Sequence, residues 1–336
     1  MTDTLTSAAP VTLPPALPRQ EAFDLIRAGK ISAALEPARA LQAAFERGET
    51  SDSGMRAALS VFSSYRPELT ESIVDNAETR GGDYLSLLAA GLHFAALLSL
   101  KRTMRRGGDV PEENVKLMVT AAENSEIYLN RALHATSQPS VAYAEKQRTA
   151  MTFGQDPWDL YAEGLKRCPG SLLIREALLR ALRAEWGGKG DFTAMRAFLT
   201  RLEIRDLPEE QLRRLKALEL GYEAHHHVAF RQDLETGYRL YRESLAITPT
   251  VNALSALISD PAANHASADA AFRQVLALDP DNDHACAVLG VRHALQGRSR
   301  HGMKLLQAAR SWGEPYATDL LENPALRKRL IQRLGL

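Results

Sequence analysis

The chain has 336 residues, 45% of them hydrophobic, so it can bury a large core, and its length alone suggests about two domains. Lysine plus arginine and aspartate plus glutamate both count 41, so no global field attracts nucleic acid or an anionic membrane. Cys168 and Cys286 stand far apart and in no metal-binding or redox spacing. They predict two packing thiols in a reducing compartment, and therefore a cytoplasmic protein.

Residues 1–18 precede the first helical pattern. This segment contains no lysine or arginine and is rich in threonine, alanine and proline. A secretory signal needs a basic start and an unbroken apolar stretch, and four prolines interrupt this one. We therefore expect a disordered lead-in.

From residue 19 onward apolar residues recur at helical spacing, and no segment shows the alternation of a strand. We expect residues 19–203 to form an N-terminal helical region, and residues 204–336 to form helical repeats that continue it as one solenoid. Turn residues divide the pattern into helices at 20–28, 31–47, 53–64, 67–80, 83–105, 111–135, 139–151, 156–168, 171–186, 192–203, 209–227, 233–247, 251–259, 266–278, 282–295, 299–311 and 324–334.

Residues 84–100 could be mistaken for a membrane span because they include no charged residue. The stretch is short, contains Ser86, His93 and Ser99, and stands alone in the chain. We expect instead a helix that is buried on all sides within the stack, and no membrane partner.

Residues 178–188 form an arginine-bearing helix pattern that ends in Trp186, Gly187 and Gly188. The two glycines are expected to supply a left-handed turn, and the indole to fill the gap beneath it. The segment is similar to the Trp-Gly-Gly-Ser motif of an uncharacterised bacterial helical family, a domain of unknown function, although Lys189 replaces the serine. This resemblance covers about residues 23–202 and implies a helical fold without implying an activity. Three upstream segments also fit it, namely Arg102-Thr-Met-Arg-Arg-Gly, Tyr128-Leu-Asn-Arg-Ala-Leu and Pro139-Ser140.

Three consecutive histidines, His225, His226 and His227, suggest a metal site at first sight. Successive residues of a helix point about 100° apart, so the three cannot converge on one ion. Glu223 and His226 have the Glu-x-x-His spacing of di-iron helical bundles, but such sites need a second motif of this kind, and the sequence lacks one. We therefore expect no metal and no cofactor, and keep a helical metalloenzyme around Glu223 and His226 as an alternative.

The last third of the chain repeats an order of small, large and small residues followed by proline. In residues 283–310 a run of small and apolar residues precedes the turn at Gly297, and Gly302, Leu306 and Ala309 follow it. Helix–turn–helix repeats of about 34 residues need such groups where one helix crosses its partner closely. The pattern resembles the tetratricopeptide family, which implies an all-α, right-handed α-solenoid of stacked antiparallel helix pairs. The two preceding units carry the same order at Ala268, Phe272, Val275 and Pro280, and at Gly237, Tyr241, Ser244 and Pro249.

In tetratricopeptide-like stacks the first helix of each unit lines a concave groove, so the resemblance implies a candidate binding strip. A mixed strip of arginine, tyrosine, histidine and an acid is typical of polar peptide recognition, and a solvated helix face is the alternative. We expect the side chains of the strip to be exposed and to contribute little to stability. The strip consists of Glu176, Arg180 and Arg183 on the helix that begins near residue 172, and of Tyr222, His225 and His226 on the next such helix.

The sequence thus predicts a non-enzymatic scaffold that holds a protein or peptide partner in the groove of a helical solenoid. The packing residues do not specify which partner. A helical metalloenzyme and a nucleic-acid-binding helical repeat are the alternatives, and the balanced charge disfavours the second.

Overall fold

The computed structural model describes residues 17–102, 110–186, 188, 190–260, 262–279, 282–322 and 328. Within these residues the secondary structure is helical and no strand occurs, which confirms the all-α prediction. The predicted lead-in lies outside them, apart from its last two residues. The helices are α1 (Arg19–Arg27), α2 (Ile31–Ala34), α3 (Glu36–Glu46), α4 (Met55–Ala58), α5 (Thr70–Thr79), α6 (Tyr84–Arg102), α7 (Glu112–Ala135), α8 (Ser140–Thr152), α9 (Trp158–Arg167), α10 (Leu172–Ala181), α11 (Thr193–Leu199), α12 (Leu202–Arg205), α13 (Glu209–His226), α14 (Leu234–Ile247), α15 (Val251–Ile258), α16 (His265–Leu278), α17 (Asp283–Leu295), α18 (Ser299–Ser311) and α19 (Pro315–Glu322).

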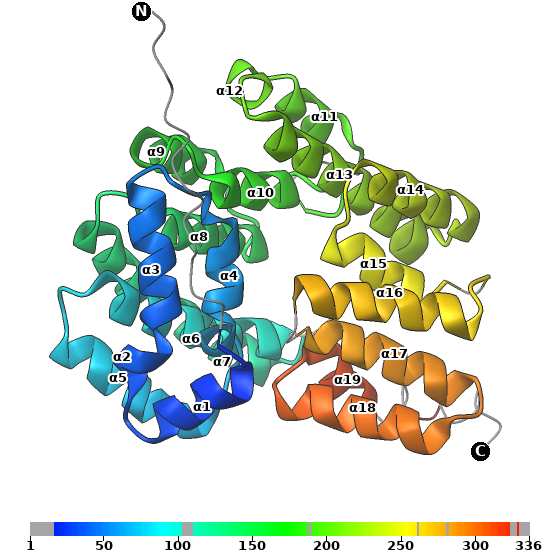
Figure 1. The fold of residues 1–336 in the computed structure, drawn as a ribbon, viewed down its shortest axis with the longest axis horizontal. Coiled ribbons are helices and arrows are strands. Elements are labelled where there is room, and N and C mark those ends of the chain that lie inside the picture. Colours follow the sequence, from blue (N-terminus) through cyan, green and yellow to red (C-terminus); the bar gives the residue numbers. More distant parts are fainter. Residues whose placement is uncertain are drawn as a thin grey trace, which may run out of the picture.

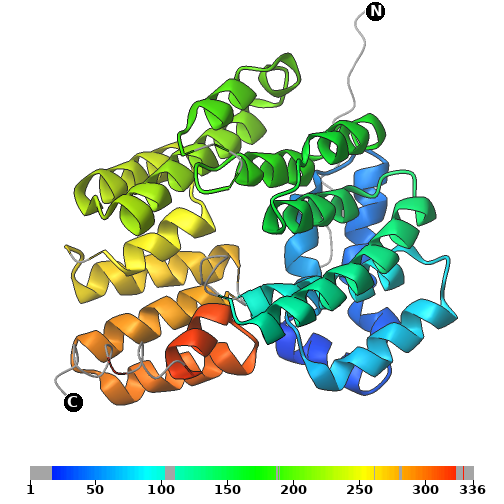
Figure 2. The ribbon, with the colours of Figure 1, turned by 180° about the vertical axis from the view of Figure 1, so that it is seen from behind.

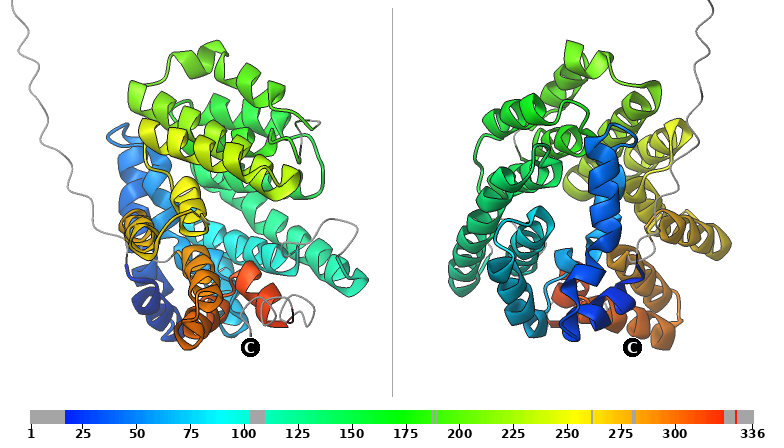
Figure 3. Two further views of the ribbon diagram at one scale, coloured as in Figure 1. Left: turned by 90° about the vertical axis from the view of Figure 1, so that its right-hand side faces the viewer. Right: turned by 60° about the vertical axis from the view of Figure 1, so that its left-hand side comes forward.

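The helices follow one another around a ring, so that the two ends of the described chain meet (Figure 1). Figure 2 shows the same path from behind, and the right-hand view of Figure 3 shows dark blue α1 beside the orange C-terminal helices. Arg19 of α1 forms an ion pair with Asp283 of α17, and the rings of Phe23 and Trp312 meet edge to face with centroids 5.7 Å apart. No pattern in the sequence predicted this closure.

Helix α6 lies at the centre of the N-terminal region, and most of its side chains are buried, as predicted for residues 84–100. Gly91 allows α7 to approach, because a Cβ at this position would lie 2.7 Å from a side-chain carbon of Leu129. The hydroxyl of Ser125 on α7 also donates to the Gly91 carbonyl at 2.8 Å. By length and composition α6 is the one helix of the described residues that could cross a membrane, and 72% of its most apolar window is buried within the structure.

In the C-terminal region three helical hairpins follow one another, namely α13 with α14, α15 with α16, and α17 with α18. Helices α17 and α18 cross at two glycines, where a Cβ on Gly302 would lie 2.5 Å from the carbonyl oxygen of Gly290. The turn between them contains Gly297 with φ +83°, a left-handed conformation that favours glycine. Leu306 and Ala309 are buried at this contact. The predicted roles of these small residues are thus confirmed.

Some predicted helices are shorter than the sequence pattern suggested. Segment 31–47 is interrupted at Leu35, between α2 and α3, because Pro37 has no amide hydrogen to continue the helical bonding. Segments 53–64 and 192–203 are each divided into shorter helices. Helix α19 was not predicted, and Pro315 opens it at a position where a missing donor is tolerated. The helix predicted at 324–334 lies outside the described residues except for Lys328.

Candidate functional site

The six residues of the predicted strip lie on α10, on the turn after it, and on α13, and the two helices pack against each other. The guanidinium carbon of Arg183 lies 5.0 Å from the ring centroid of Tyr222, and the neighbouring Tyr222, Glu176 and Glu145 side chains raise the pKa of Arg180. His226 approaches the same network through Glu185, whose carboxylate oxygen lies 3.5 Å from its Nδ1 atom. The structure therefore brings Arg183, Tyr222 and, through Glu185, His226 into one connected group of side chains.

The burial of the strip differs from the prediction. Glu176, Tyr222 and His226 are 6%, 5% and 9% exposed, whereas Arg180, Arg183 and His225 are only partly exposed. The expectation that these side chains are exposed to solvent is therefore wrong. The physical reason is helix packing, because α13 covers the polar side of α10 that the isolated helix pattern would leave in water.

Three carboxylates neutralise three arginines in this network. Their side chains are 10%, 7% and 8% exposed, and a carboxylate removed from water in this way needs a counter-charge. These acids therefore serve as counter-ions in the structure. The pairs are Glu145 with Arg148, Glu176 with Arg214, and Glu185 with Arg183.

Arg56 of α4 adds a further guanidinium to this network. Its side chain is exposed to solvent, yet loss of solvation by the surrounding protein lowers its pKa, and the charge of Arg180 lowers the pKa further. Among the described residues no carboxylate lies within ion-pair distance of Arg56 or Arg180. The arginine cluster is defined as Arg56, Arg148, Arg180, Arg183 and Arg214.

Arg56 reaches the cluster because Asp52 docks its segment on the beginning of α10. The Asp52 carboxylate accepts hydrogen bonds from the Ser171 hydroxyl and from the amides of Leu172 and Leu173, at 3.0 and 3.3 Å for the amides. These amides are donors that a helix N-terminus leaves without partners. Burial raises the pKa of Asp52, and the hydrogen bonds oppose this effect. No local sequence pattern connects Asp52 with α10, so the sequence analysis missed Arg56.

The elements that carry the arginine cluster, α4, α8, α10 and α13, border the centre of the ring (Figure 1). Groups on other elements of the ring approach the same region. The guanidinium carbon of Arg102, at the end of α6, lies 5.8 Å from the ring of Trp186. Burial lowers the pKa of His225 to about 3, and the charges of Arg183 and of His284 on α17 contribute to this shift. The cluster therefore lies where several parts of the ring converge.

The Trp-Gly-Gly segment has a different geometry from the predicted one. Trp186 is 37% exposed, so its indole does not fill a gap beneath the turn. The left-handed conformation belongs to Gly190, with φ +88°, and not to Gly188. Gly188 is required for another reason, because a Cβ there would lie 2.7 Å from the carbonyl oxygen of Leu182. Gly187 and Lys189 lie outside the described residues.

The three consecutive histidines have separate surroundings. His226 packs between the rings of Phe192 and Phe230, with centroid distances of 5.4 and 5.3 Å. The Nδ1 atom of His227 lies 3.2 Å from a carboxylate oxygen of Asp233. Glu223, the acid of the predicted alternative, pairs at 2.8 Å with an arginine of α11. Among the described residues no group of three or more His, Cys, Asp or Glu side chains could hold a metal ion.

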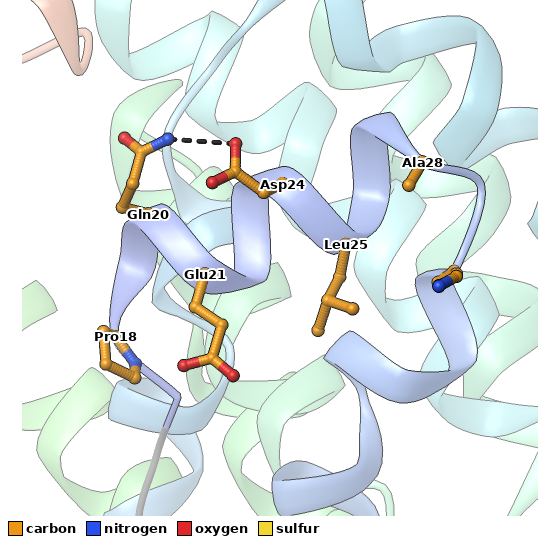
Figure 4. Close-up of a pocket in the computed structure, with 7 residues that line it drawn as sticks. Pro18, Gln20, Glu21, Asp24, Leu25 and Ala28 are labelled. Carbon is orange, nitrogen blue, oxygen red and sulfur yellow. Dashed lines mark hydrogen bonds between the residues drawn. The ribbon is translucent and has the colours of Figure 1, made fainter.

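A shallow pocket lies at the outer side of α1 (Figure 4). Its polar side chains include Gln20, which donates to Asp24 at 3.0 Å, and Glu21. All three are exposed to water, and the pocket contains no buried polar group that could orient a ligand. The arginine cluster is therefore the stronger candidate site.

Comparisons with protein families, with curated proteins and with solved structures find no match for this chain. The resemblances to the tetratricopeptide family and to the Trp-Gly-Gly-Ser family stay predictions. The function is therefore inferred from the geometry of the arginine cluster.

Proposed function

We propose that this protein is a non-enzymatic scaffold that holds a protein or peptide partner against the arginine cluster. The observation that carries the proposal is the contact of the Arg183 guanidinium with the Tyr222 ring at 5.0 Å, beside the ion pairs of Arg183 with Glu185 and of Arg214 with Glu176. Arginine and tyrosine are the residue types that most often dominate the energy of an interface. A partner that presents hydrogen-bond acceptors would find donors already held in place there.

The scaffold would be a right-handed α-solenoid of the tetratricopeptide type in its C-terminal region, with the N-terminal region continuing the stack. Support comes from the three consecutive hairpins and from the close helix crossing at Gly290 and Gly302. Repeat proteins of this kind act through extended binding surfaces on their inner side. The contact of α1 with α17 and with Trp312 would then hold the inner side in a fixed shape.

A location in the cytoplasm is part of the proposal. Cys168 is buried, Cys286 is partly buried, and both are free thiols. Burial raises the pKa of the Cys168 thiol to about 12 and that of Cys286 to about 11, which favours the unreactive thiol form. Both features are consistent with packing thiols in a reducing compartment.

The variant that tests the proposal is Arg56→Met. The double reversal of Arg180 and Arg183 would be a poor choice, because removing Arg183 leaves the buried Glu185 carboxylate without its counter-ion. Arg56 has no such carboxylate among the described residues, so its removal leaves no acid unpaired. Arg47→Met provides a matched control, because Arg47 is exposed and pairs only with nearby Glu49.

The experiment is affinity purification of the full chain from its native cell, with cross-linking and quantitative mass spectrometry. We expect one predominant protein to be cross-linked to the parent chain and to the Arg47→Met chain, and to be strongly reduced with Arg56→Met. Equal recovery of every protein with both variants would refute binding at the cluster. Recovery that a nuclease abolishes would support a nucleic-acid-binding repeat, and one tightly held transition metal per chain would support a metalloenzyme.

A further inference from the structure

The two ends of the described chain meet at a seam whose contacts are mostly polar. Arg19 pairs with Asp283, and the guanidinium of Arg66 donates to the Ser311 carbonyl at 2.7 Å in a solvent-exposed position. Charged and polar groups regain water when their partners separate, so such contacts contribute little net free energy. The seam is defined by Arg19, Phe23 and Arg66 on one side and by Asp283, Ser311 and Trp312 on the other.

Arg66 lies at the centre of the seam. Its guanidinium carbon lies 4.6 Å from the ring centroid of Phe23 and 5.0 Å from that of Trp312, so it contacts an aromatic ring from each side. Arg66 precedes a short helical turn and Trp312 follows the end of α18, so both residues stand outside the helices. Residues in such turns can move without breaking the hydrogen bonds of a helix.

Little apolar core crosses the seam. The core of the N-terminal region is built from residues between Leu17 and Ala177, and Trp312 is the only later residue that packs against it among those described. Helix α19 also approaches α6, but none of its residues belongs to this core. Around the rest of the ring neighbouring cores share side chains, such as Leu133 and Leu257, or are joined along α13. The seam is thus the place where the ring can separate with the smallest loss of apolar contact.

We propose that the ring opens and closes at the seam, and that this motion admits the partner to the inner side and retains it there. This inference rests on the proposed scaffold function and specifies how its binding is regulated. The helices that carry the arginine cluster border the centre of the ring (Figure 1). Separation of α1 from α17 and α18 would widen the approach to that centre while the apolar cores on both sides stay packed.

The test measures distances across the seam in the full chain by double electron–electron resonance. Spin labels are attached to cysteines that replace Lys30, directly after α1, and Lys304 on α18, both of which are exposed. Cys286→Ala removes the partly buried native thiol, and Cys168 is buried away from the label. We expect one distance for the closed ring and a second, longer distance for the open ring.

Arg66→Met should raise the ratio of the longer to the shorter distance about tenfold, because it removes the bond to Ser311 and the contacts with both rings. Its ionic partner Glu68 is exposed and stays in water, so no buried acid is left unpaired. Arg47→Met is a matched control, because Arg47 pairs with Glu49 two residues later, as Arg66 pairs with Glu68. It should change neither distance. A single distance, the same in the parent chain and in Arg66→Met, would overturn the proposal.

A second label pair separates opening of the ring from unfolding of α1. Labels at Lys30 and at Arg80, which is exposed at the end of α5, lie on the same side of the seam. Their distance should stay unchanged in Arg66→Met. If it broadens together with the distance across the seam, α1 has detached by itself and the ring has not opened, which would also overturn the proposal.

The partner identified by cross-linking then connects opening with binding. It should dissociate about tenfold faster from Arg66→Met than from the parent chain when the purified complex is diluted, and equal rates would refute retention by the seam.

The two proposals fail in different ways. If a cellular protein depends on Arg56 but only one distance is found across the seam, the opening is wrong and the scaffold function stands. If the distance responds to Arg66→Met but no cellular protein depends on Arg56, the scaffold function is wrong and the opening stands.

Discussion

In the C-terminal half of the ring, α17 and α18 meet at two glycines, Gly290 and Gly302, whereas in the N-terminal half the segment of α4 is fixed to α10 by the carboxylate of Asp52. The first contact is steric and joins neighbouring helices. The second is polar and joins residues that are 119 positions apart, Asp52 and Ser171. The comparison teaches that one helical architecture is secured in two ways, one sensitive to side-chain volume and the other to hydrogen bonding and charge.

We expect the largest loss of stability where α17 and α18 cross at Gly290 and Gly302. In Gly302→Leu even the Cβ would lie 2.5 Å from the Gly290 carbonyl oxygen and 2.7 Å from the amide of Ala294, so the helices must separate. We expect the free energy of unfolding to fall by about 3 kcal/mol or more, measured by urea denaturation. Lys304→Leu places the same side chain on the exposed face of α18 and should change stability by less than about 0.5 kcal/mol. Equal stability of the two variants would show that the crossing is looser than described.

The N-terminal half should respond to acid through His93 of α6. This imidazole is fully buried, hydrogen-bonded to Thr70 at 2.9 Å, and burial lowers its pKa to about 4. The unfolded chain takes up the proton near the ordinary pKa of about 6.5, so the contribution of His93 is present above that pH and is lost as the pH falls towards 4. The loss is on the order of 3 kcal/mol.

Urea unfolding at a series of pH values tests this prediction. His93→Gln cannot gain a proton, so its stability should decline less steeply between pH 6.5 and 4 than that of the parent chain, whatever its stability at neutral pH. Parallel pH dependence in the two proteins would show that His93 is not responsible for the acid sensitivity.

The hydrogen bonds between Asp52 and the beginning of α10 should contribute somewhat less to the free energy of unfolding. Asp52→Ala leaves the Ser171 hydroxyl and the amides of Leu172 and Leu173 without their long-range acceptor, and we expect a loss of about 2 kcal/mol. Asp191→Ala removes a carboxylate that accepts from an amide within its own turn, and should cost about 1 kcal/mol or less. If thermal unfolding shows that the two variants are equally stable, a long-range cap contributes no more to stability than a local one.

The smallest expected effect concerns the turn at Gly297. A Cβ there would meet no atom within 4 Å, so only the left-handed backbone opposes a side chain. We expect Gly297→Val to lower the free energy of unfolding by about 1 kcal/mol. Gly297→Asn should lower it by less, because asparagine tolerates this conformation better. Melting temperatures of the two variants provide the comparison. If Gly297→Asn and Gly297→Val lower the melting temperature equally, the cause is steric and not the left-handed backbone.

The contrast between the two halves also explains how much of the structure could be predicted. The hairpin of α17 and α18 follows from local patterns, because Gly297 and Gly302 are close to their contacts in the chain. The sequence also predicted which residues share a face of α10 and of α13, but it did not predict which elements cover those faces. Glu176 and Tyr222 were therefore expected in solvent, whereas both are buried.

Long-range polar contacts left no pattern in the sequence. Asp52 looks like an ordinary turn residue, and Arg56 belongs to a segment that was predicted only as a plain helix. Their importance depends on α10, which follows more than a hundred residues later. Helical periodicity reports which residues of one helix share a face, and it carries no information about which distant segment meets that face.

The contact of the N-terminal segment with α17 and α18 has a consequence for synthesis of the chain. Arg66, which donates to the Ser311 carbonyl, and Arg19, whose partner is Asp283, leave the ribosome 245 and 264 residues before those partners. At translation rates of about 5–20 residues per second, this delay is on the order of tens of seconds. During that time the ring of Phe23 lacks its edge-to-face contact with Trp312, which has not yet been made. This segment is thus synthesised long before its packing is completed, and chaperones that recognise exposed aromatic surface have a long opportunity to bind it.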